Sequence, residues 1–366
     1  MTRHYLDHAS TSPLRPEALA LMTEWLGKAG DPGRIYAEGL EARVAVETAR
    51  EQVADLLGTR PRSVVFTSGA TEAIAAACWG AAERGTHQVL TAVEHSAVRL
   101  GAGANGSVTL VGTDRHGRVD PDEVLKAVRP DTAVVHIQWG NHEVGTRQPV
   151  AEVVARCQSQ GVLVHVDAAQ AIGHDTINFD DLGADLLSVS AHKFGGPTGA
   201  GALLVRRGLR VRPLLLGGDQ ERARRAGLES VSSIAGFGAA AAAVQTETES
   251  AEQRRLTERI GAAATEWVGV HRYGDPTDRL PHLVCLGIDG IEPQAVILGL
   301  DRAGVAAHSG SACSSEDLEP SPVLEAMGLD AHRSLRLSVG WNTTNADVTA
   351  VIDALPPILE GLRSLR

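Results

Sequence analysis

Seven short apolar runs, separated by stretches of helical character, occupy the first two-thirds of this 366-residue chain and constrain its fold most strongly. Strands that alternate with helices indicate an α/β architecture around a mostly parallel sheet. Several runs are apolar throughout, as expected of strands that helices cover on both faces. The predicted strands are Val64–Thr67, Gln88–Val93, Val108–Gly112, Ala133–Gln138, Leu163–Asp167, Leu186–Ser190 and Ala202–Arg206, and intervening helices include Ala42–Leu57, Thr71–Arg84 and Val150–Gln160. We therefore expect a large domain built on a mostly parallel, seven-stranded sheet.

The last third of the chain has a different pattern, typical of a smaller α+β domain. Its predicted elements are a long helix over Gly238–Val268, a strand at Leu283–Gly287, a helix at Pro293–Ala303, a short helix near Pro322–Met327, a strand at Ser334–Val339 and a helix from Asn345. Thr344 and Asp347 fit a capping box for the last helix. We expect the large domain to span residues 13–250, and the small domain to combine residues 1–12 with residues 251–366.

The charge and hydropathy of the chain argue against some functional classes. The formal net charge of −11 disfavours a dedicated nucleic-acid surface, and the one basic cluster noted, Arg222, Arg224 and Arg225, fits a solvated or salt-bridged segment equally well. No run approaches the roughly 20 apolar residues of a membrane span. The first residues show no apolar stretch of the signal-peptide kind. The expectation is a cytoplasmic protein without a nucleic-acid or membrane partner.

The four cysteines divide into two kinds by their surroundings. Cys78, Cys157 and Cys285 lie in apolar periodic runs, where buried packing is expected. Cys313 lies in the small, polar segment Ser309-Gly310-Ser311-Ala312-Cys313-Ser314-Ser315, which predicts a loop with an accessible thiol. The cysteine spacings match no zinc pattern, so we expect no metal site.

Two strand ends carry residues suited to an anionic or aromatic ligand. At Ser68-Gly69-Ala70-Thr71-Glu72 a strand passes through a glycine turn into a helix, whose first amides are unpaired and favour a phosphate. Capping alone would also account for this sequence. Glu94 and His95 end another strand; His95 there can stack on a cofactor ring or move a proton, although a lone histidine is often structural.

Two further strand ends carry an acid and a lysine. Asp167 ends a buried strand, where open α/β sheets place ligand-binding groups, although a helix N-cap is an equal alternative. Lys193 follows the next strand, in Ser190-Ala191-His192-Lys193, before a glycine-rich turn. Lysine occurs elsewhere only at Lys28 and Lys126, in settings less suited to chemistry. Lys193 is therefore the candidate to hold an aldehyde cofactor as a Schiff base.

These motifs, in this order, resemble those of a known family. The segments Gly69-Ala70-Thr71-Glu72, Glu94-His95, His165-Val166-Asp167-Ala168-Ala169-Gln170, Ser190-Ala191-His192-Lys193 and the later Cys313 loop are similar to those of the NifS/IscS-like cysteine desulfurases, in the class V aminotransferase group. The resemblance runs from Tyr5 nearly to the C-terminus. It implies the fold type I architecture of pyridoxal-phosphate enzymes and a homodimer.

The resemblance also implies a role for each matching residue. Lys193 would hold pyridoxal 5'-phosphate, Asp167 would pair with its ring nitrogen, His95 would stack on the ring, and Gln170 would bind its phenolic oxygen. Phosphate ligands would be Ala70, Thr71, Ser190 and His192. Asn141 would lie near the substrate, and Arg336 would bind the substrate carboxylate as a fork. Cys313 would be the nucleophile that receives sulfur.

The activity implied is cysteine desulfurase. Lys193, released by the substrate, would take the Cα proton of L-cysteine, and the Cys313 thiolate would then attack the substrate sulfur. The products would be L-alanine and a persulfide on Cys313. An iron–sulfur scaffold, a tRNA-thiolating enzyme or another sulfur carrier would accept the persulfide sulfur.

Four positions depart from the family pattern. Leu228 stands where relatives carry a threonine that reaches the cofactor phosphate of the partner subunit, which puts that contact in doubt. Asp31 lies in an early loop where relatives have asparagine, and it would repel a substrate carboxylate if it faced the site. His142 replaces an asparagine, and Thr198 replaces a lysine.

Three other interpretations remain open at this stage. A selenocysteine lyase or another pyridoxal-phosphate C–S lyase would share most of these residues. A degenerate paralogue that binds partners without turnover finds support only in Leu228. An NAD-binding module would need a G-x-G-x-x-G motif after its first strand, and the chain has none there.

Overall fold

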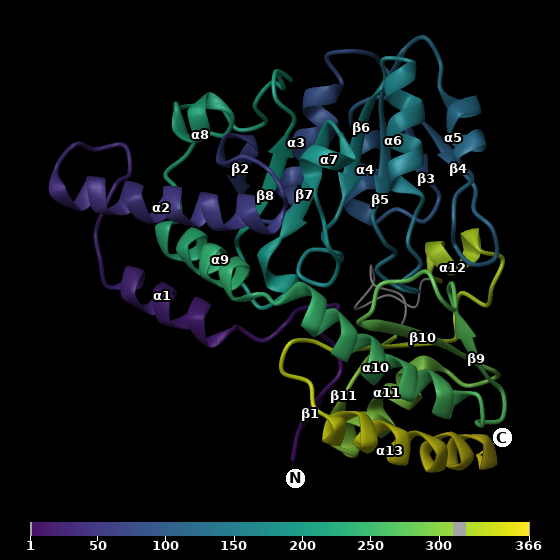
Figure 1. Ribbon diagram of the computed structural model, residues 1–366. Helices are drawn as coiled ribbons and strands as arrows, with labels where there is room; N and C mark the ends of the chain where they lie inside the picture. Colours follow the sequence, from purple (N-terminus) through teal and green to yellow (C-terminus); the bar gives the residue numbers. More distant parts are fainter. Residues whose placement is uncertain (1, 310–319, 366) are drawn as a thin grey trace.

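The predicted strands assemble into one seven-stranded sheet, called the large sheet below. The computed structural model describes residues 2–309 and 320–365. In strand order, the large sheet contains β2 (Val64–Thr67), β8 (Gly201–Val205), β7 (Leu186–Ser190), β6 (Leu163–Asp167), β5 (Thr132–Gln138), β3 (His87–Thr91) and β4 (Ser107–Val111) (Figure 1). Strands β7, β6, β5, β3 and β4 pair in parallel, and only β8 runs against its neighbours β2 and β7. The predicted mostly parallel sheet of seven strands is confirmed.

Helices cover both faces of the large sheet, because its strands are apolar on both sides. One face packs on α3 (Ala70–Ala81) and α4 (Ser96–Gly103). The other packs on α2 (Ala37–Leu56), α5 (Pro121–Ala127), α6 (Val150–Ser159), α7 (Phe179–Leu182) and α9 (Val231–Ala243). Helix α1 (Pro16–Leu26) packs on α9, and the short turn α8 (Gln220–Ala223) lies beside α2, where Glu221 and Arg222 bond to Arg50 and Glu47. Short 3₁₀ turns occupy Pro61–Ser63 and Ala191–Lys193.

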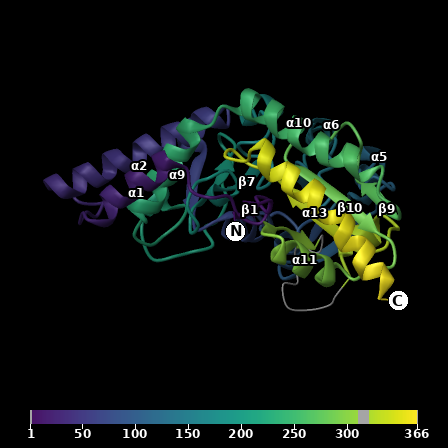
Figure 2. The same ribbon diagram turned by 90° about the horizontal axis from the view of Figure 1, so that it is seen from below.

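A second, four-stranded sheet, called the small sheet, forms the core of the C-terminal third. Its strand order is β12 (His308–Ser309), β13 (Ser334–Ser338), β10 (Leu283–Ile288) and β9 (Val270–Tyr273). Helices α10 (Thr246–Ala264), α11 (Pro293–Arg302) and α13 (Asn345–Ser364) bury its outer side, as the view from below shows (Figure 2). The short helix α12 (Pro322–Ala326) packs near the other side.

The N-terminus joins this second layer, as predicted from the sequence. Strand β1 (His4–Tyr5) pairs in parallel with β11 (Val305–Ala306), and Leu6 lies in the apolar cluster of the small sheet. The capping box of Thr344 and Asp347 at the start of α13 is also present. The two largest apolar cores among the described residues are thus separate, while the proposed domain limits at residues 12 and 250 stay a prediction; residue 250 itself lies within α10.

The long helix predicted over Gly238–Val268 is wrong, because the chain breaks there into α9 and α10. Val244 is extended (φ −64°, ψ 130°) and buried against the core of the large sheet. The amide of Gln245 then donates to the Glu249 carboxylate, which Arg15 holds through two hydrogen bonds of 2.9 and 2.6 Å. Because of this break, α9 packs in the core of the large sheet and α10 packs in the core of the small sheet.

None of the helices within residues 2–309 and 320–365 combines the length and apolar character needed to cross a bilayer.

Candidate active site

The ends of five strands of the large sheet open onto one cavity of about 440 Å³, where the two layers meet. Strands β2, β3, β5, β6 and β7 each bring their last residues, or the residues that follow them, to this edge, as the parallel topology requires. Nine residues predicted for the site line the cavity: Ala70, Thr71, His95, Asp167, Gln170, Ser190, His192, Lys193 and Arg336. The first eight come from the large-sheet layer and Arg336 from β13 of the small sheet.

One end of the cavity is suited to an anion. Helix α3 begins at Ala70 directly after Gly69, and the first amides of a helix have no partner within it. Gly69 has φ +155°, and a Cβ there would lie 3.9 Å from Ser190 Oγ, so the turn and the serine are adjacent. His192 Nδ1 is buried and has no partner among the described residues. Burial and the nearby Lys193 lower the pKa of His192 to about 4, so its ring is neutral and can donate one N–H.

Lys193 lies at the centre of the cavity. Its Nζ donates to the backbone oxygens of Ala9, at 2.6 Å, and Ser10, at 3.1 Å. Burial and, to a lesser degree, the Arg336 charge lower the pKa of this amine to about 8, against the opposite influence of Asp7 and Asp167. An amine with this pKa is partly uncharged near neutral pH, which a nucleophile or base requires.

Asp167 and His95 are buried near each other and near Lys193. Asp167 Oδ1 accepts from the amide of Ala169 at 3.0 Å. Burial raises the pKa of Asp167, while hydrogen bonds and the charges of His95 and Lys193 oppose the rise. His95 caps helix α4 by accepting the Ala97 amide on Nδ1, so its proton lies on Nε2. Burial lowers the pKa of His95 as well, which favours the neutral ring.

Arg336 supplies the guanidinium on the other side of the cavity. It is 2% exposed and is held by the backbone oxygen of His142 at 2.9 Å, Ser10 Oγ at 2.8 Å and Asp7 Oδ1 at 3.2 Å. Its Nε has no hydrogen-bond partner in the described part of the chain. A fixed guanidinium of this kind binds carboxylates well.

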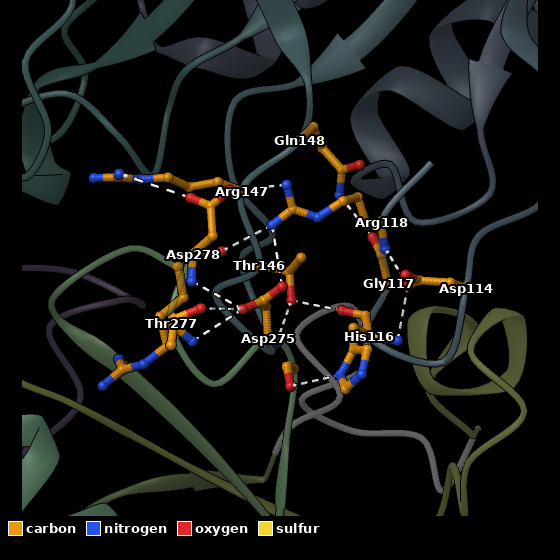
Figure 3. Close-up of polar contacts among 12 residues, drawn as sticks. Asp114, His116, Gly117, Arg118, Thr146, Arg147, Gln148, Asp275, Thr277 and Asp278 are labelled. Atoms are coloured by element: carbon orange, nitrogen blue, oxygen red, sulfur yellow. Dashed lines mark hydrogen bonds and ion pairs between the residues drawn. The ribbon is translucent and has the colours of Figure 1, made fainter. Parts of the chain in front are cut away.

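The loop after β5, residues 139–148, carries Gly140 and His142 to the cavity wall and is tied to both layers (Figure 3). Thr146 Oγ1 donates to the backbone oxygen of His116 at 2.6 Å and accepts the amide of Asp275 at 2.9 Å. Arg118 bonds Asp275 and Asp278, and the Arg147 amide donates to the Asp278 backbone oxygen at 3.1 Å. The network joins the large-sheet loops to the segment that follows β9.

Thr146→Val should destabilise the protein by about 1–2 kcal/mol, because the shape is kept while the half-buried oxygen of His116 and amide of Asp275 lose their partner. Thr146 is fully buried. Urea unfolding would measure the loss. Thr277→Val is the control, since its hydroxyl donates to Asp275 at the exposed end of the same network. Equal stability of Thr146→Val and wild type would show that the network does not hold the loop.

Comparison with known proteins bears on this geometry. The aminotransferase class-V family model matches residues 4–351. The chain is 39% identical to "Cysteine desulfurase IscS" of Dictyoglomus turgidum, over 99% of this chain and 95% of that protein, and 41% identical to "Cysteine desulfurase" of Trichormus azollae, over 99% and 94%. A solved structure titled "NIFS-LIKE PROTEIN" superimposes with a TM-score of 0.91 at 31% identity, covering 99% of this chain and all of that one.

The chain belongs to the aminotransferase class-V family, in its cysteine desulfurase group. The resemblance inferred from the motifs is thereby confirmed, and so is the fold of the NifS-like enzymes. Members of this family generally depend on pyridoxal phosphate.

The cavity residues fit such a cofactor. Pyridoxal phosphate needs an amine for its aldehyde, an acid for its ring nitrogen and donors for its phosphate. The cavity offers Lys193 with a lowered pKa, the buried carboxyl of Asp167, and the amides at the start of α3 beside the unpartnered His192 Nδ1. A volume of about 440 Å³ lies within the range of cofactor sites.

Not every residue predicted for the desulfurase site lies in the cavity. Asn141 is fully buried outside the lining: its amide donates to the Val93 oxygen at 3.2 Å, and its oxygen accepts the amides of Glu143 and Val144. Its side chain therefore positions the loop in this geometry, and the predicted substrate contact has no support from it. Cys313 lies outside the described residues.

The two departures that raised doubts about ligand binding lie away from this cavity. Leu228 is 61% exposed and does not contribute to the lining. Asp31 accepts the amide of Gly33 at 2.8 Å and pairs with Arg34 at 3.0 Å. Within this chain, then, Asp31 does not face the groups expected to bind a substrate carboxylate.

Sequence reasoning missed five polar residues of the lining as site residues: Ser10, Ser68, Gln138, His142 and Thr198. Gln138 had a visible signal, since it ends a buried strand as Asp167 does. His142 and Thr198 were noted as departures from relatives without being placed. The ring of His142 lies edge-on to His95 with centroids 5.1 Å apart, and neither of its ring nitrogens has a hydrogen-bond partner among the residues described.

The lowered pKa of Lys193 predicts how cofactor capture depends on pH. With a pKa of about 8, the free-amine fraction should rise about tenfold from pH 7 to pH 9 and level off above. The rate at which apo-protein binds pyridoxal phosphate, followed by absorbance, should show the same plateau. An unperturbed lysine, such as Nα-acetyl-lysine in solution, should continue to accelerate beyond pH 10. A protein rate that also rises steadily through pH 10 would contradict the lowered pKa.

Proposed function

We propose that this chain is a pyridoxal-phosphate-dependent cysteine desulfurase, which converts L-cysteine to L-alanine and takes the sulfur onto Cys313 as a persulfide. The observation that carries the proposal is the convergence of Lys193, Asp167, His95 and Arg336 on one cavity, in a chain that belongs to this family. The reaction balances: L-cysteine and the Cys313 thiol give L-alanine and the Cys313 persulfide, with no other oxidant or reductant.

Different residues of the chain would bind different parts of the cofactor. Lys193 would bind it covalently, Asp167 would accept from its ring N–H, and Gln170 would bind its phenolic oxygen. The amides of Ala70 and Thr71, with Ser190 and His192, would hold its phosphate, while His95 would cover its ring. When bound, pyridoxal phosphate supplies an electron-withdrawing ring that stabilises negative charge developing at the substrate Cα.

Substrate binding and proton transfer would use the remaining groups. Arg336 would bind the carboxylate of L-cysteine, exchanging its contact with Asp7 for the ligand. The amine of Lys193, once displaced by the substrate amine, would take the Cα proton; its low pKa suits that task. Cys313 would then accept the sulfur and present it to an acceptor protein, such as an iron–sulfur scaffold or a thiolating enzyme, in the cytoplasm.

The test is to incubate the purified protein with L-cysteine and a reductant and to measure sulfide and alanine together. Wild type is expected to form both in equal amounts, and Cys313→Ala to form neither above background. Cys157→Ala is the matched control, because that thiol is fully buried in the core of the large sheet, away from the cavity. If Cys313→Ala still forms both products, a direct C–S lyase is the correct assignment; if only selenocysteine is cleaved, the protein is a selenocysteine lyase.

A homodimer is part of the same proposal, and an exposed apolar patch supports it. Ile35, Tyr36 and Val44 are 87%, 54% and 65% exposed at the start of α2, and Leu216 and Leu228 are 80% and 61% exposed in the segment that flanks α8. The two segments border one surface hollow. Clusters of exposed apolar side chains of this kind mark protein interfaces.

Replacing Ile35 and Leu216 by aspartate should shift the protein from dimer to monomer, because two charges would be buried in the interface. Sedimentation velocity would measure the change. Replacing Leu298 and Val268, exposed at 60% and 80% in the small-sheet layer, by aspartate should leave the dimer intact. A wild-type protein that sediments as a monomer would overturn the proposal.

A further inference from the structure

A chain of buried hydrogen bonds leads through the large sheet to Asp167. It starts at the Gln88 side chain on β3, 2.8 Å from His136 Nε2 on β5. His136 Nδ1 lies 2.9 Å from His165 Nδ1 on β6, and His165 Nε2 lies 3.2 Å from Ser188 Oγ on β7. Ser188 Oγ is 3.4 Å from Asp167 Oδ1, and the two residues pair directly across β6 and β7. The first four side chains are fully buried, and Asp167 is 8% exposed.

Both histidines are neutral, so the position of the single N–H on each ring sets which of its two neighbours donates a hydrogen bond and which accepts one. Burial lowers the pKa of His165 to about 3, and burial together with His165 lowers that of His136 well below its usual value. A neutral imidazole has one N–H and one accepting nitrogen. Fixing the proton on one histidine therefore fixes the donor at every other link of the chain.

Two opposite directions are possible, and the buried groups favour one of them. If His136 donates to the Gln88 oxygen, Ser188 must donate to His165 instead of Asp167, and the Gln88 amide nitrogen is buried with no described partner. If the two ends of the Gln88 amide are exchanged, that nitrogen donates to His136, His136 donates to His165, and His165 donates to Ser188. The Ser188 hydroxyl is then free to donate to Asp167. A carboxylate can only accept, and an unpaired carbonyl is cheaper to bury than an unpaired N–H.

We propose that His136 and His165, acting through Ser188, are positioning residues that direct this hydrogen-bond chain toward Asp167 and keep it a carboxylate acceptor for the cofactor's ring N–H. The inference rests on the proposed function only in requiring pyridoxal phosphate in the cavity. The Ser188 contact is long for an O–H···O bond, so its influence on Asp167 is moderate in size. This hydrogen-bond chain influences the cofactor's ring nitrogen through Asp167 and includes none of the groups proposed to bind the substrate.

The other titratable groups that face this site are the same residues in every variant compared. Among them, Cys78 Sγ lies 3.9 Å from His136 Nε2, and burial raises the pKa of its thiol to about 12, so the thiol stays protonated. Asp167 is within electrostatic reach of His95 and Lys193; burial and, to a lesser degree, the charge of Asp167 raise the pKa of Glu94 to about 8. Lys193 is influenced by Arg336, Asp7 and Asp167. None of these belongs to the chain apart from Asp167 itself.

The experiment compares holoenzyme variants by the pH midpoint of the cofactor's visible absorbance band. A protonated ring nitrogen withdraws electrons from the covalent bond between the cofactor and Lys193, which lowers the pH midpoint of the absorbance band. Weaker protonation of the ring nitrogen therefore raises that midpoint. Ser188→Ala and His165→Phe should each raise the midpoint by about one pH unit. The signal of ¹⁵N-labelled cofactor should move toward the unprotonated ring. His165→Gln keeps a donor and an acceptor and should recover most of the shift.

The matched control is His87→Phe. His87 is equally buried on β3 and bridges Thr132 and Thr109, at 2.8 and 2.9 Å, without contact to the chain. It should leave the midpoint unchanged. An unchanged midpoint in Ser188→Ala, or an equal shift in His87→Phe, would overturn the proposal. The readout needs bound cofactor but no turnover, so a protein that ignores L-cysteine would overturn the proposed function alone.

Discussion

Lys193→Ala is expected to abolish both the covalent attachment of pyridoxal phosphate and the formation of alanine from L-cysteine. The substitution removes the amine that would bind the aldehyde and the base that would take the Cα proton. Loss of a general base alone costs about 10²–10⁴-fold in rate. Since the anchor is lost as well, we expect turnover to fall by at least about 10³-fold, while the fold is retained because the Nζ bonds only two backbone oxygens.

The scarcity of lysine makes this result unusually easy to check. Lys28, Lys126 and Lys193 are the only lysines, so borohydride reduction followed by peptide mass analysis has three candidate sites. The label should appear on Lys193 in wild type and on no peptide in Lys193→Ala. Lys126→Ala is the control, because that side chain is exposed and pairs with Glu123 on the surface. A label on Lys28 or Lys126, or full activity in Lys193→Ala, would contradict the assignment.

Much of this site could be predicted from the sequence, because parallel topology turns chain order into position. Asp167, Lys193 and His95 each follow a short apolar run, and parallel strands bring such ends to one edge. The contribution of Arg336 could not be derived in this way. It lies in the small sheet, and its place opposite Lys193 depends on how the two layers pack, which no local pattern records.

The residues that sequence analysis missed depend on tertiary context of the same kind. Nothing in the runs around His136 and His165 shows that the two rings meet across neighbouring strands, since their register is set by pairing over 29 residues. The break between α9 and α10 was missed because an alanine-rich start and charged later turns suit a continuous helix. Burial of Val244 in the first core and the Arg15–Glu249 pair override that local preference.

The turn α8 shows most clearly that a local sequence pattern does not record tertiary contacts. It is also where we expect the largest effect of a substitution on stability. Glu221, Arg222 and Ala223 all have positive φ, of 49°, 59° and 61°, although none is glycine. Each left-handed residue of this kind costs about 1–2 kcal/mol. The conformation persists because Glu221 is buried: its carboxylate accepts two bonds of 2.7 Å from Arg50 and the amide of Phe66 at 2.8 Å.

Glu221→Gln should therefore destabilise the protein by about 3–5 kcal/mol, because it leaves the buried guanidinium of Arg50 without its buried counter-charge. Arg50 and Glu221 are 3% and 5% exposed, so water cannot replace the lost partner. Urea unfolding should show a lower midpoint for this variant. Glu47→Gln is the matched control: Glu47 also pairs with Arg50, at 3.1 Å, but its side chain is 43% exposed, and it should cost under about 1 kcal/mol.

A second variant separates the ion pair from the strained backbone. Ala223→Gly removes the Cβ from a residue at φ 61°, so relief of strain should offset the greater freedom of glycine when unfolded, and stability should stay level or rise. If Glu221→Gln and Glu47→Gln unfold at the same urea concentration, the buried pair does not hold the turn. The left-handed residues would then need contacts from the second subunit of the proposed homodimer, and aspartates at Ile35 and Leu216, which should dissociate that dimer, should destabilise the wild-type turn instead.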